Sequence, residues 1–302
     1  MTTPSLLVLG NANVDLVLGE VDGWPAIGTE VMVERSEMRA GGSAGNTALA
    51  LTGLGVPHLF VASTGDDPNG AWLRSQFDST FCDWIVDRCD TTVTVGIVHK
   101  GGDRAFFTTP GHLQTARLDD LLSRLPTAPH DRSCAIVSGG FLMPNIMAGT
   151  SRLLSALKAH GWMTAIDPGW TPDGWNNTVR ALLANWLVHA DFALLNEEEA
   201  KGFAALDDLD QAAKTIADGM AMDQSLVIKR GKQGAAAYRA GTIINAPSSR
   251  VRVIDTVGAG DTFNAAFLAS IAQNGSLDLA LKEGVRIAAH AISTFPRRYE
   301  SE

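Results

Sequence analysis

The chain has 302 residues, of which 45% are hydrophobic and 19% charged, and its formal net charge at pH 7 is −9. This is ample material for a large buried core, which excludes an intrinsically disordered protein. Because the net charge is negative and the sequence has no cluster of basic residues, we expect no binding to nucleic acid or to an anionic membrane surface.

The three cysteines form no CxxC pair, so we expect neither a zinc site nor a disulfide framework. No apolar stretch approaches the ~20 residues that span a bilayer, and the first apolar run is too short for a secretory signal. These features predict a cytoplasmic protein.

Short apolar runs alternate along the chain with longer segments of helical periodicity. The expected strands are residues 6–10, 58–62, 135–138, 163–167, 192–196 and 225–229, and the expected helices are residues 44–54, 69–76, 146–160, 179–187, 197–206 and 210–220. This alternation predicts an α/β fold with a doubly wound, mostly parallel sheet flanked by helices. Ligands of such folds bind beyond the carboxyl ends of the strands.

Two regions depart from this alternation. Residues 14–18 and 30–34 alternate with a period of two, as do residues 92–109 around a Gly-Gly turn, which is a hairpin signal. We expect a small antiparallel β lid made of residues 13–38 and 91–109. The α/β core, with the main ligand site, would then comprise residues 1–12, 39–90 and 110–302.

The most specific motif is DTVGAGDTF, which begins at Asp255 and leads into an almost wholly apolar helix. Gly258, Ala259 and Gly260 enter that helix, where free N–H groups and the helix dipole can form an anion hole. Asp261 lies in the first turn and faces the same anion. The alternative is that Asp261 only caps the helix and the glycines only form a turn.

A second motif, GGSAGNTA, begins at Gly41. Gly41 and Gly42 let the main chain approach a ligand closely, and Asn46 is a polar residue in an apolar helix. The same letters match G-x-S-x-G, the nucleophile elbow of serine hydrolases, with Ser43 as nucleophile. That elbow needs a buried strand before it, whereas residues 34–39 are polar, so we regard a hydrolase as the weaker interpretation. An ordinary Gly-rich helix start also fits.

Polar residues follow two of the expected strands. Asn13 and Asp15 could hydrogen-bond hydroxyl groups of a sugar, although Asn and Asp are also common in turns. Asn196 and Glu199, three residues apart, could hold a hydrated Mg²⁺, or they could simply cap a helix.

A basic turn, KRGKQG, follows the strand at 225–229 and begins at Lys229. It suits a nucleotide phosphate, but it also suits an ordinary hairpin. Neither a complete Walker A motif nor a complete GxGxxG motif is present, so the common ATPase and dinucleotide-binding fingerprints are missing.

Together these motifs resemble the ribokinase family, also called PfkB-type carbohydrate kinases, over essentially the whole chain and in the family's order. The resemblance implies an ATP-dependent kinase that phosphorylates a primary hydroxyl of a sugar or nucleoside. It also implies Mg²⁺ as a cofactor, activation by K⁺ as in some members, and a homodimer formed through the lid. A non-catalytic sugar- or nucleotide-binding protein on the same fold is the alternative.

The resemblance also implies residue roles. Asp261 matches the catalytic base, and Gly258, Ala259 and Gly260 match the anion hole. The acceptor-binding positions correspond to Asn13, Asp15, Gly41, Gly42 and Asn46. The nucleotide-binding positions correspond to Asn196, Lys229, Gly231, Gly234 and His290. The metal positions correspond to Glu199 for Mg²⁺ through water, and to Asp255 and the Val257 carbonyl for a monovalent cation.

Two departures from the family pattern matter. Lys229 stands where members often have Thr, and no carboxylate follows the strand at 135–138, which weakens ribose as the acceptor. Asp15 is the only charged candidate among the acceptor contacts. Because a carboxylate accepts strong hydrogen bonds from hydroxyls and repels a second anion, we expect a neutral sugar or nucleoside.

Overall fold

The computed structural model describes residues 4–101, 104–294 and 299. Its main sheet has the strand order β13-β12-β11-β10-β9-β8-β1-β4-β5. The strands are β1 Leu6–Gly10, β4 Leu59–Gly65, β5 Cys82–Asp87, β8 Cys134–Ser138, β9 Met163–Asp167, β10 Phe192–Asn196, β11 Ser225–Lys229, β12 Ala235–Arg239 and β13 Thr242–Ala246. All strands from β11 to β5 pair in parallel, and β12 and β13 add an antiparallel edge.

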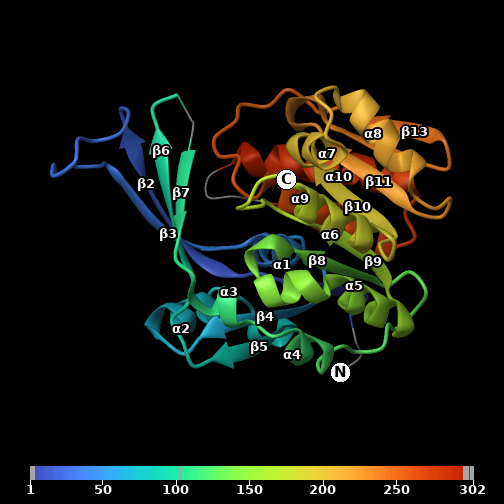
Figure 1. Cartoon of the computed structure of the whole chain (residues 1–302), viewed down its shortest axis with the longest axis horizontal. Coiled ribbons are helices and arrows are strands. Elements are labelled where there is room, and N and C mark those ends of the chain that lie inside the picture. Colours follow the sequence, from blue (N-terminus) through green and yellow to red (C-terminus); the bar gives the residue numbers. More distant parts are fainter. Residues whose placement is uncertain (1–3, 102–103, 295–298, 300–302) are drawn as a thin grey trace.

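Helices cover both faces of this sheet (Figure 1). They are α1 Ser43–Gly53, α2 Pro68–Ser75, α3 Gly111–Thr115, α4 Leu118–Leu122, α5 Pro144–Ala159, α6 Asn177–Leu187, α7 Glu197–Ala204, α8 Leu209–Asp218, α9 Ala259–Ala272 and α10 Leu277–Ile292. The expected doubly wound α/β fold is therefore confirmed, and each predicted core strand and helix lies within a few residues of its expected bounds.

Alternation along the strands divides the core into two hydrophobic clusters. In β1, Leu7 and Leu9 pack with helices α3 to α8, whereas Leu6 and Val8 pack with α1, α2, α9 and α10. These side chains are almost fully buried, so shortening one such Leu to Ala would cost about 2–5 kcal/mol of stability. The core thus holds the carboxyl ends of the strands in fixed positions.

A second sheet forms the lid, with the strand order β3-β2-β6-β7. Its strands are β2 Asn13–Val21, β3 Arg35–Gly41, β6 Val93–His99 and β7 Arg104–Thr108. Figure 1 shows them standing at one side of the core. The pairs β2–β3 and β6–β7 are antiparallel as expected, and β2–β6 is parallel.

The strand expected at residues 30–34 is wrong. The structure has no strand there, and β3 begins at Arg35 and continues to Gly41. The period of two at 30–34 comes from a largely exposed connection, where alternation reflects no buried face. The division of the chain into core and lid stays a prediction, although β3 runs through its proposed boundary between residues 38 and 39.

None of the helices in the described ranges has the length and hydropathy that a bilayer crossing requires.

Candidate active site

The two signature motifs meet where helices α1 and α9 begin. Gly258 is the N-cap of α9 and adopts a left-handed φ of 71°, a conformation that favours glycine. Asp261 follows in the first turn, and its Oδ2 accepts a hydrogen bond of 2.9 Å from Nδ2 of Asn46 in α1. Gly258 is the N-cap, so Asp261 does not occupy the cap position, and its role as a base stays a prediction. The carboxylate is instead held beside the N–H groups that open α9.

The acceptor motifs also come together, at the base of the lid. Asn13 and Gly41 are paired across β2 and β3, and Nδ2 of Asn13 donates a 2.6 Å hydrogen bond to Oδ1 of Asp15. A Cβ atom at Gly41 would collide with the Asp15 carboxylate, so only glycine allows this approach. Nδ2 of Asn13 also donates to Oγ1 of Thr94 at 3.2 Å.

The electrostatics of Asp15 follow from its burial. Desolvation raises the pKa of Asp15 to about 6, and the hydrogen bond from Asn13 and the charge of Arg39 offset only part of this effect. A carboxylate that has lost water in this way gains most from hydroxyl groups that replace it.

The basic turn places Lys229 next to the start of α9, where the anion hole is expected. Its Nζ lies 2.7 Å from Oδ2 of Asp167 and 3.4 Å from Oδ1 of Asn264, and Asn264 donates to the same Asp167 oxygen at 2.5 Å. A Cβ atom built on Gly260 would lie 3.4 Å from this Nζ. Burial alone would lower the pKa of the Lys229 ammonium, but the charges of Asp167 and Glu199 outweigh it and raise that pKa.

Asn196 and Glu199 form a capping box at the start of α7. Oδ1 of Asn196 accepts from the Glu199 N–H at 2.9 Å, and Oε2 of Glu199 accepts from the Asn196 N–H at 2.8 Å. Burial, and next to it the charge of Asp167, raise the pKa of Glu199 to about 8. The helix-cap interpretation of these two residues therefore holds in the structure.

We tested whether the site fits Mg²⁺. In the described residues, no group of three or more His, Cys, Asp or Glu side chains is arranged to hold a metal. Mg²⁺ commonly keeps several waters and uses one or two carboxylates with substrate phosphates, so such a group is not required. Burial is the main cause of the raised pKa of Glu199, and the charges of Asp167 and Asp261 add to it, so carboxylates gather where a hydrated divalent cation could reduce their repulsion. The residues present therefore fit Mg²⁺.

The side-chain contacts of Asp255 do not match the expected K⁺ site. Oδ2 of Asp255 accepts a 2.6 Å hydrogen bond from Arg39, and Oδ1 accepts one of 2.9 Å from Arg104 and one of 3.0 Å from the Val257 N–H. Both carboxylate oxygens are thus committed to guanidinium groups. These residues therefore do not fit a K⁺ ion at Asp255.

A cavity of about 650 Å³ lies beyond the anion hole, within the size range of small-molecule sites. Lys229, Gly231, Gly234, Ala259 and Gly260 line it. A smaller cavity of about 380 Å³ contains Asn196 and shares Lys229 and Gly231 with the larger one. The predicted nucleotide residues other than His290 thus border one continuous region.

His290 does not line the larger cavity. The face of α10 toward it consists of Val285, Ala288, Ala289 and Ile292, which recur at helical spacing. His290 is rotated off this face. The helical spacing of the apolar residues on this face was the signal that could have identified the cavity wall from the sequence.

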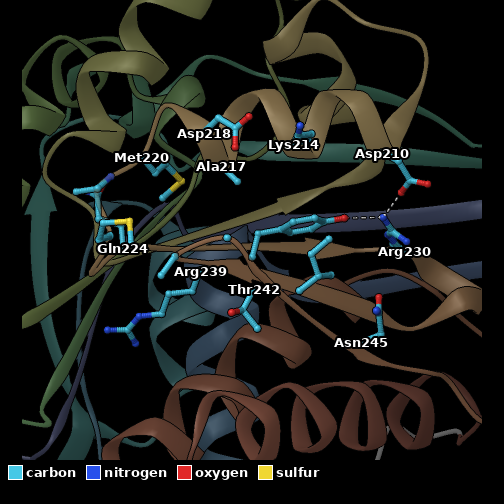
Figure 2. Close-up of a pocket in the computed structure, with 16 residues that line it drawn as sticks. Asp210, Lys214, Ala217, Asp218, Met220, Gln224, Arg230, Arg239, Thr242 and Asn245 are labelled. Carbon is cyan, nitrogen blue, oxygen red and sulfur yellow. Dashed lines mark hydrogen bonds and ion pairs between the residues drawn. The ribbon is translucent and has the colours of Figure 1, made fainter.

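A further cavity of about 700 Å³ lies elsewhere, in a groove between α8 and the β12–β13 hairpin (Figure 2). Among the predicted motifs only the basic turn reaches it. Arg230 turns into this groove, where it contacts Asp210 at 2.7 Å and the hydroxyl of Tyr238 at 2.9 Å. Arg230 thus borders both this groove and the smaller cavity that contains Asn196.

Comparison with models of known protein families identifies the family of this chain. The model of the pfkB family carbohydrate kinases matches residues 3–297. The chain belongs to the pfkB family of carbohydrate kinases. It is therefore a phosphotransferase that uses an alcohol group as acceptor, as the two signatures predict. The hydrolase interpretation is wrong: the strand before Ser43 is β3, which belongs to the small sheet and is only partly buried, not a buried strand of the main sheet.

Two curated relatives illustrate the range of pfkB carbohydrate kinases similar to this chain. A fructokinase of Rhizobium leguminosarum bv. trifolii is 29% identical over 249 residues, which are 79% of this chain and 73% of that protein. An ATP-dependent ribose-1-phosphate kinase of Halopiger xanaduensis is 29% identical over 283 residues, which are 92% of this chain and 88% of that protein.

Solved structures show the same fold. The Arabidopsis thaliana ribokinase complexed with ribose and ATP superimposes with a TM-score of 0.78 at 21% identity, covering 97% of this carbohydrate kinase and 94% of that chain. The adenosine kinase of Sinorhizobium meliloti gives a TM-score of 0.78 at 20% identity, covering 99% and 97% of the two chains.

Sequence reasoning missed three residues of the site. Asp167 ends the buried strand β9, and a carboxylate at the carboxyl end of a parallel strand was a usable signal. Asn264 is a fully buried amide in the apolar helix α9, which was a second signal. Thr94 lies on the lid strand β6, where nothing in the sequence distinguishes it from its neighbours.

Proposed function

We propose that the protein is an ATP-dependent kinase that phosphorylates a primary hydroxyl of a neutral sugar or nucleoside. The observation that carries the proposal is the position of the Asp261 carboxylate. It lies in the first turn of α9 beside the Gly258–Gly260 main chain, and a hydrogen bond of 2.9 Å joins it to Asn46 of the acceptor motif. A general base between an acceptor site and an anion hole is the arrangement that phosphoryl transfer needs.

In the proposed reaction, Asp261 takes the proton of the acceptor hydroxyl as its oxygen attacks the γ-phosphorus of ATP. The bond to the β–γ bridging oxygen breaks, and ADP leaves. In this proposal the N–H groups of Gly258, Ala259 and Gly260 stabilise the charge on the transferred phosphoryl group. The Ala259 N–H donates to the Thr256 carbonyl at 3.2 Å, so it would share its hydrogen bond with the phosphoryl oxygen. Loss of one such donor typically costs about 3–4 kcal/mol. Mg²⁺, held near Glu199 through water, would supply further charge neutralisation for the phosphates.

The proposal of a neutral acceptor rests on the charges around Asp15. This buried carboxylate faces hydroxyl-binding partners, Asn13 and Thr94, and would repel an anionic acceptor. Arg39 and Arg104, the nearby cations, are both engaged by Asp255. The named activities of the relatives cover free sugars and a sugar phosphate, so the acceptor's charge is the property to measure.

The decisive experiment measures ADP release with Mg-ATP and a panel of acceptors. D-Fructose, D-ribose and adenosine represent neutral acceptors, and ribose-1-phosphate and 2-dehydro-3-deoxygalactonate represent anionic ones. We expect a neutral compound to give the highest kcat/KM. Faster turnover of an anionic compound would contradict neutrality, and ADP release that no acceptor stimulates would favour the non-catalytic alternative.

We further propose that residues 13–38 and 91–109 act as a lid and as the interface of a homodimer. Large apolar side chains are exposed there, namely Trp24, Ile27, Met32 and Phe107. Patches of this kind mark interaction surfaces. Light scattering after gel filtration should give the mass of a dimer for the wild type and of a monomer for Ile27→Asp/Met32→Asp. A monomeric wild type would contradict this interface.

A further inference from the structure

Three arginines of the lid converge on one carboxylate of the core, Arg39 and Arg104 through hydrogen bonds and Arg35 of β3 as a more distant ion pair at 3.9 Å. Arg39 of β3 lies 2.6 Å from Oδ2 of Asp255, and Arg104 of β7 lies 2.9 Å from Oδ1. The side chains of Arg39, Arg104 and Asp255 are 20%, 21% and 10% exposed, so solvent screens these ion pairs only in part. Strands from both sides of the lid sheet are thus fastened to the same point of the core.

Asp255 lies in the loop that leads into the expected anion hole. Oδ1 of Asp255 also accepts the Val257 N–H at 3.0 Å, and Val257 is the residue before Gly258, the N-cap of α9. Burial acts to raise the pKa of Asp255, but hydrogen bonds from Arg39 and Val257 and the charge of Arg104 hold it below its ordinary value. Asp255 therefore stays charged, and its position shapes the loop that presents the anion-hole N–H groups.

The other end of this connection is the acceptor site. Arg39 is directly opposite Asp15 in the β2–β3 pairing, and opposite residues of antiparallel strands project on the same face. Asp15, Thr94, Arg104, Asp255 and Val257 line one small cavity of about 20 Å³ between lid and core, which leaves room for about one water molecule. The lid residues that would contact the acceptor therefore lie next to Arg104, which contacts Asp255 in the loop before α9.

From this geometry we infer that Arg39 and Arg104 are positioning residues, which couple lid closure over the acceptor to the conformation of the anion-hole loop through Asp255. The inference rests on the proposed function. With the lid down, two guanidinium groups fix Asp255, and Asp255 fixes the Val257 N–H and the start of α9. With the lid up, the loop loses these restraints, so the anion hole is complete only when an acceptor can be enclosed.

Amide hydrogen exchange tests the coupling without any acceptor or ATP. Asp255→Asn should speed exchange in both lid strands, 35–41 and 104–108, as well as locally. Arg39→Gln/Arg104→Gln should speed exchange in residues 255–260, which belong to the core. Reciprocity of this kind is what coupling between two sites requires.

Lys100→Gln is the matched control. Lys100 also carries a lid ion pair, with Asp22 at 3.1 Å, but both side chains are well exposed and lie away from Asp255. This variant should leave exchange at residues 255–260 unchanged. Exchange in α5 serves as the reference for global destabilisation, because α5 packs in a different core cluster from α9.

Kinetics give the second readout, with Mg-ATP and the best of D-fructose, D-ribose and adenosine. The double arginine variant should lose roughly 10- to 100-fold in kcat, the scale expected for misplaced catalytic groups, with the KM for ATP nearly unchanged. Unchanged exchange at 255–260 in that variant, or faster exchange everywhere including α5, would overturn the inference. A wild type that phosphorylates none of the panel contradicts only the proposed function, since the exchange experiment needs no acceptor.

Discussion

The ammonium of Lys229 lies 2.7 Å from Oδ2 of Asp167, and both side chains are almost fully buried beside the anion hole. This pair places a fixed cation where members of the family often have a threonine hydroxyl. Asn264 completes the arrangement by donating to the same oxygen. The pair joins the end of β11, on the nucleotide side, to the end of β9.

Lys229→Met should destabilise the protein and reduce turnover. Removing one partner of a buried ion pair typically costs about 3–5 kcal/mol, because the other charge is left uncompensated. Asp167→Asn/Lys229→Met should recover most of the stability, measured by urea unfolding, but not the turnover. Recovery of turnover together with stability would show that the ammonium has a structural role only.

Asp261→Asn should lower kcat by about 10²–10⁴-fold, the usual contribution of a general base, and leave ATP affinity nearly intact. Asparagine keeps the size of the side chain and can still bond to Asn46. Steady-state kinetics and ATP titration check both parts, with Asp210→Asn in the distant α8 groove as the control. A variant that retains more than about a tenth of wild-type kcat would exclude Asp261 as the base.

The KM for a neutral acceptor should rise as the pH falls through about 6, because Asp15 then takes up a proton and loses its strength as a hydrogen-bond acceptor. Above that pH the carboxylate is charged and KM should be constant. Asp15→Asn should show a high KM with no such dependence. Equal pH profiles for the two proteins would remove Asp15 from acceptor binding.

The substitution Glu199→Gln distinguishes a role of this residue in capping α7 from a role in holding Mg²⁺. Glutamine can also complete a capping box, so the variant keeps the helix start and removes the charge. Because folding raises the Glu199 pKa from 4.5 to about 8, the folded state binds more protons than the unfolded state between these values. This residue's contribution to stability therefore falls as pH rises through that window.

Denaturant unfolding should accordingly find Glu199→Gln gaining stability relative to the wild type as the pH rises from about 5 to about 8. Its turnover should require more Mg²⁺. If the Mg²⁺ titration does not change, Glu199 only caps α7.

The sequence predicted the core of this fold well, because buried parallel strands such as β10 and β11 are short apolar runs between helical patterns. It also predicted that the residues around Asn46 and Asp261 share a site, through the two signatures. The link between Lys229 and Asp167 could not be predicted, because three distant segments meet there and no local pattern encodes their distance. The family resemblance suggested a cation at Asp255, and no local pattern showed that arginines of the lid pair with it instead.

The position of β1 in the main sheet has a consequence for folding during synthesis. β1 lies between β4 and β8, so its residue Leu9 pairs with Val137 on one side and Val61 on the other. While the chain leaves the ribosome, the first strand must wait for β8 before it has both neighbours, and Arg39 must wait far longer for Asp255. Long-range pairings of this kind slow folding and leave unpaired strand edges exposed. A nascent chain halted before β8 would therefore present one edge of its central strand to other chains.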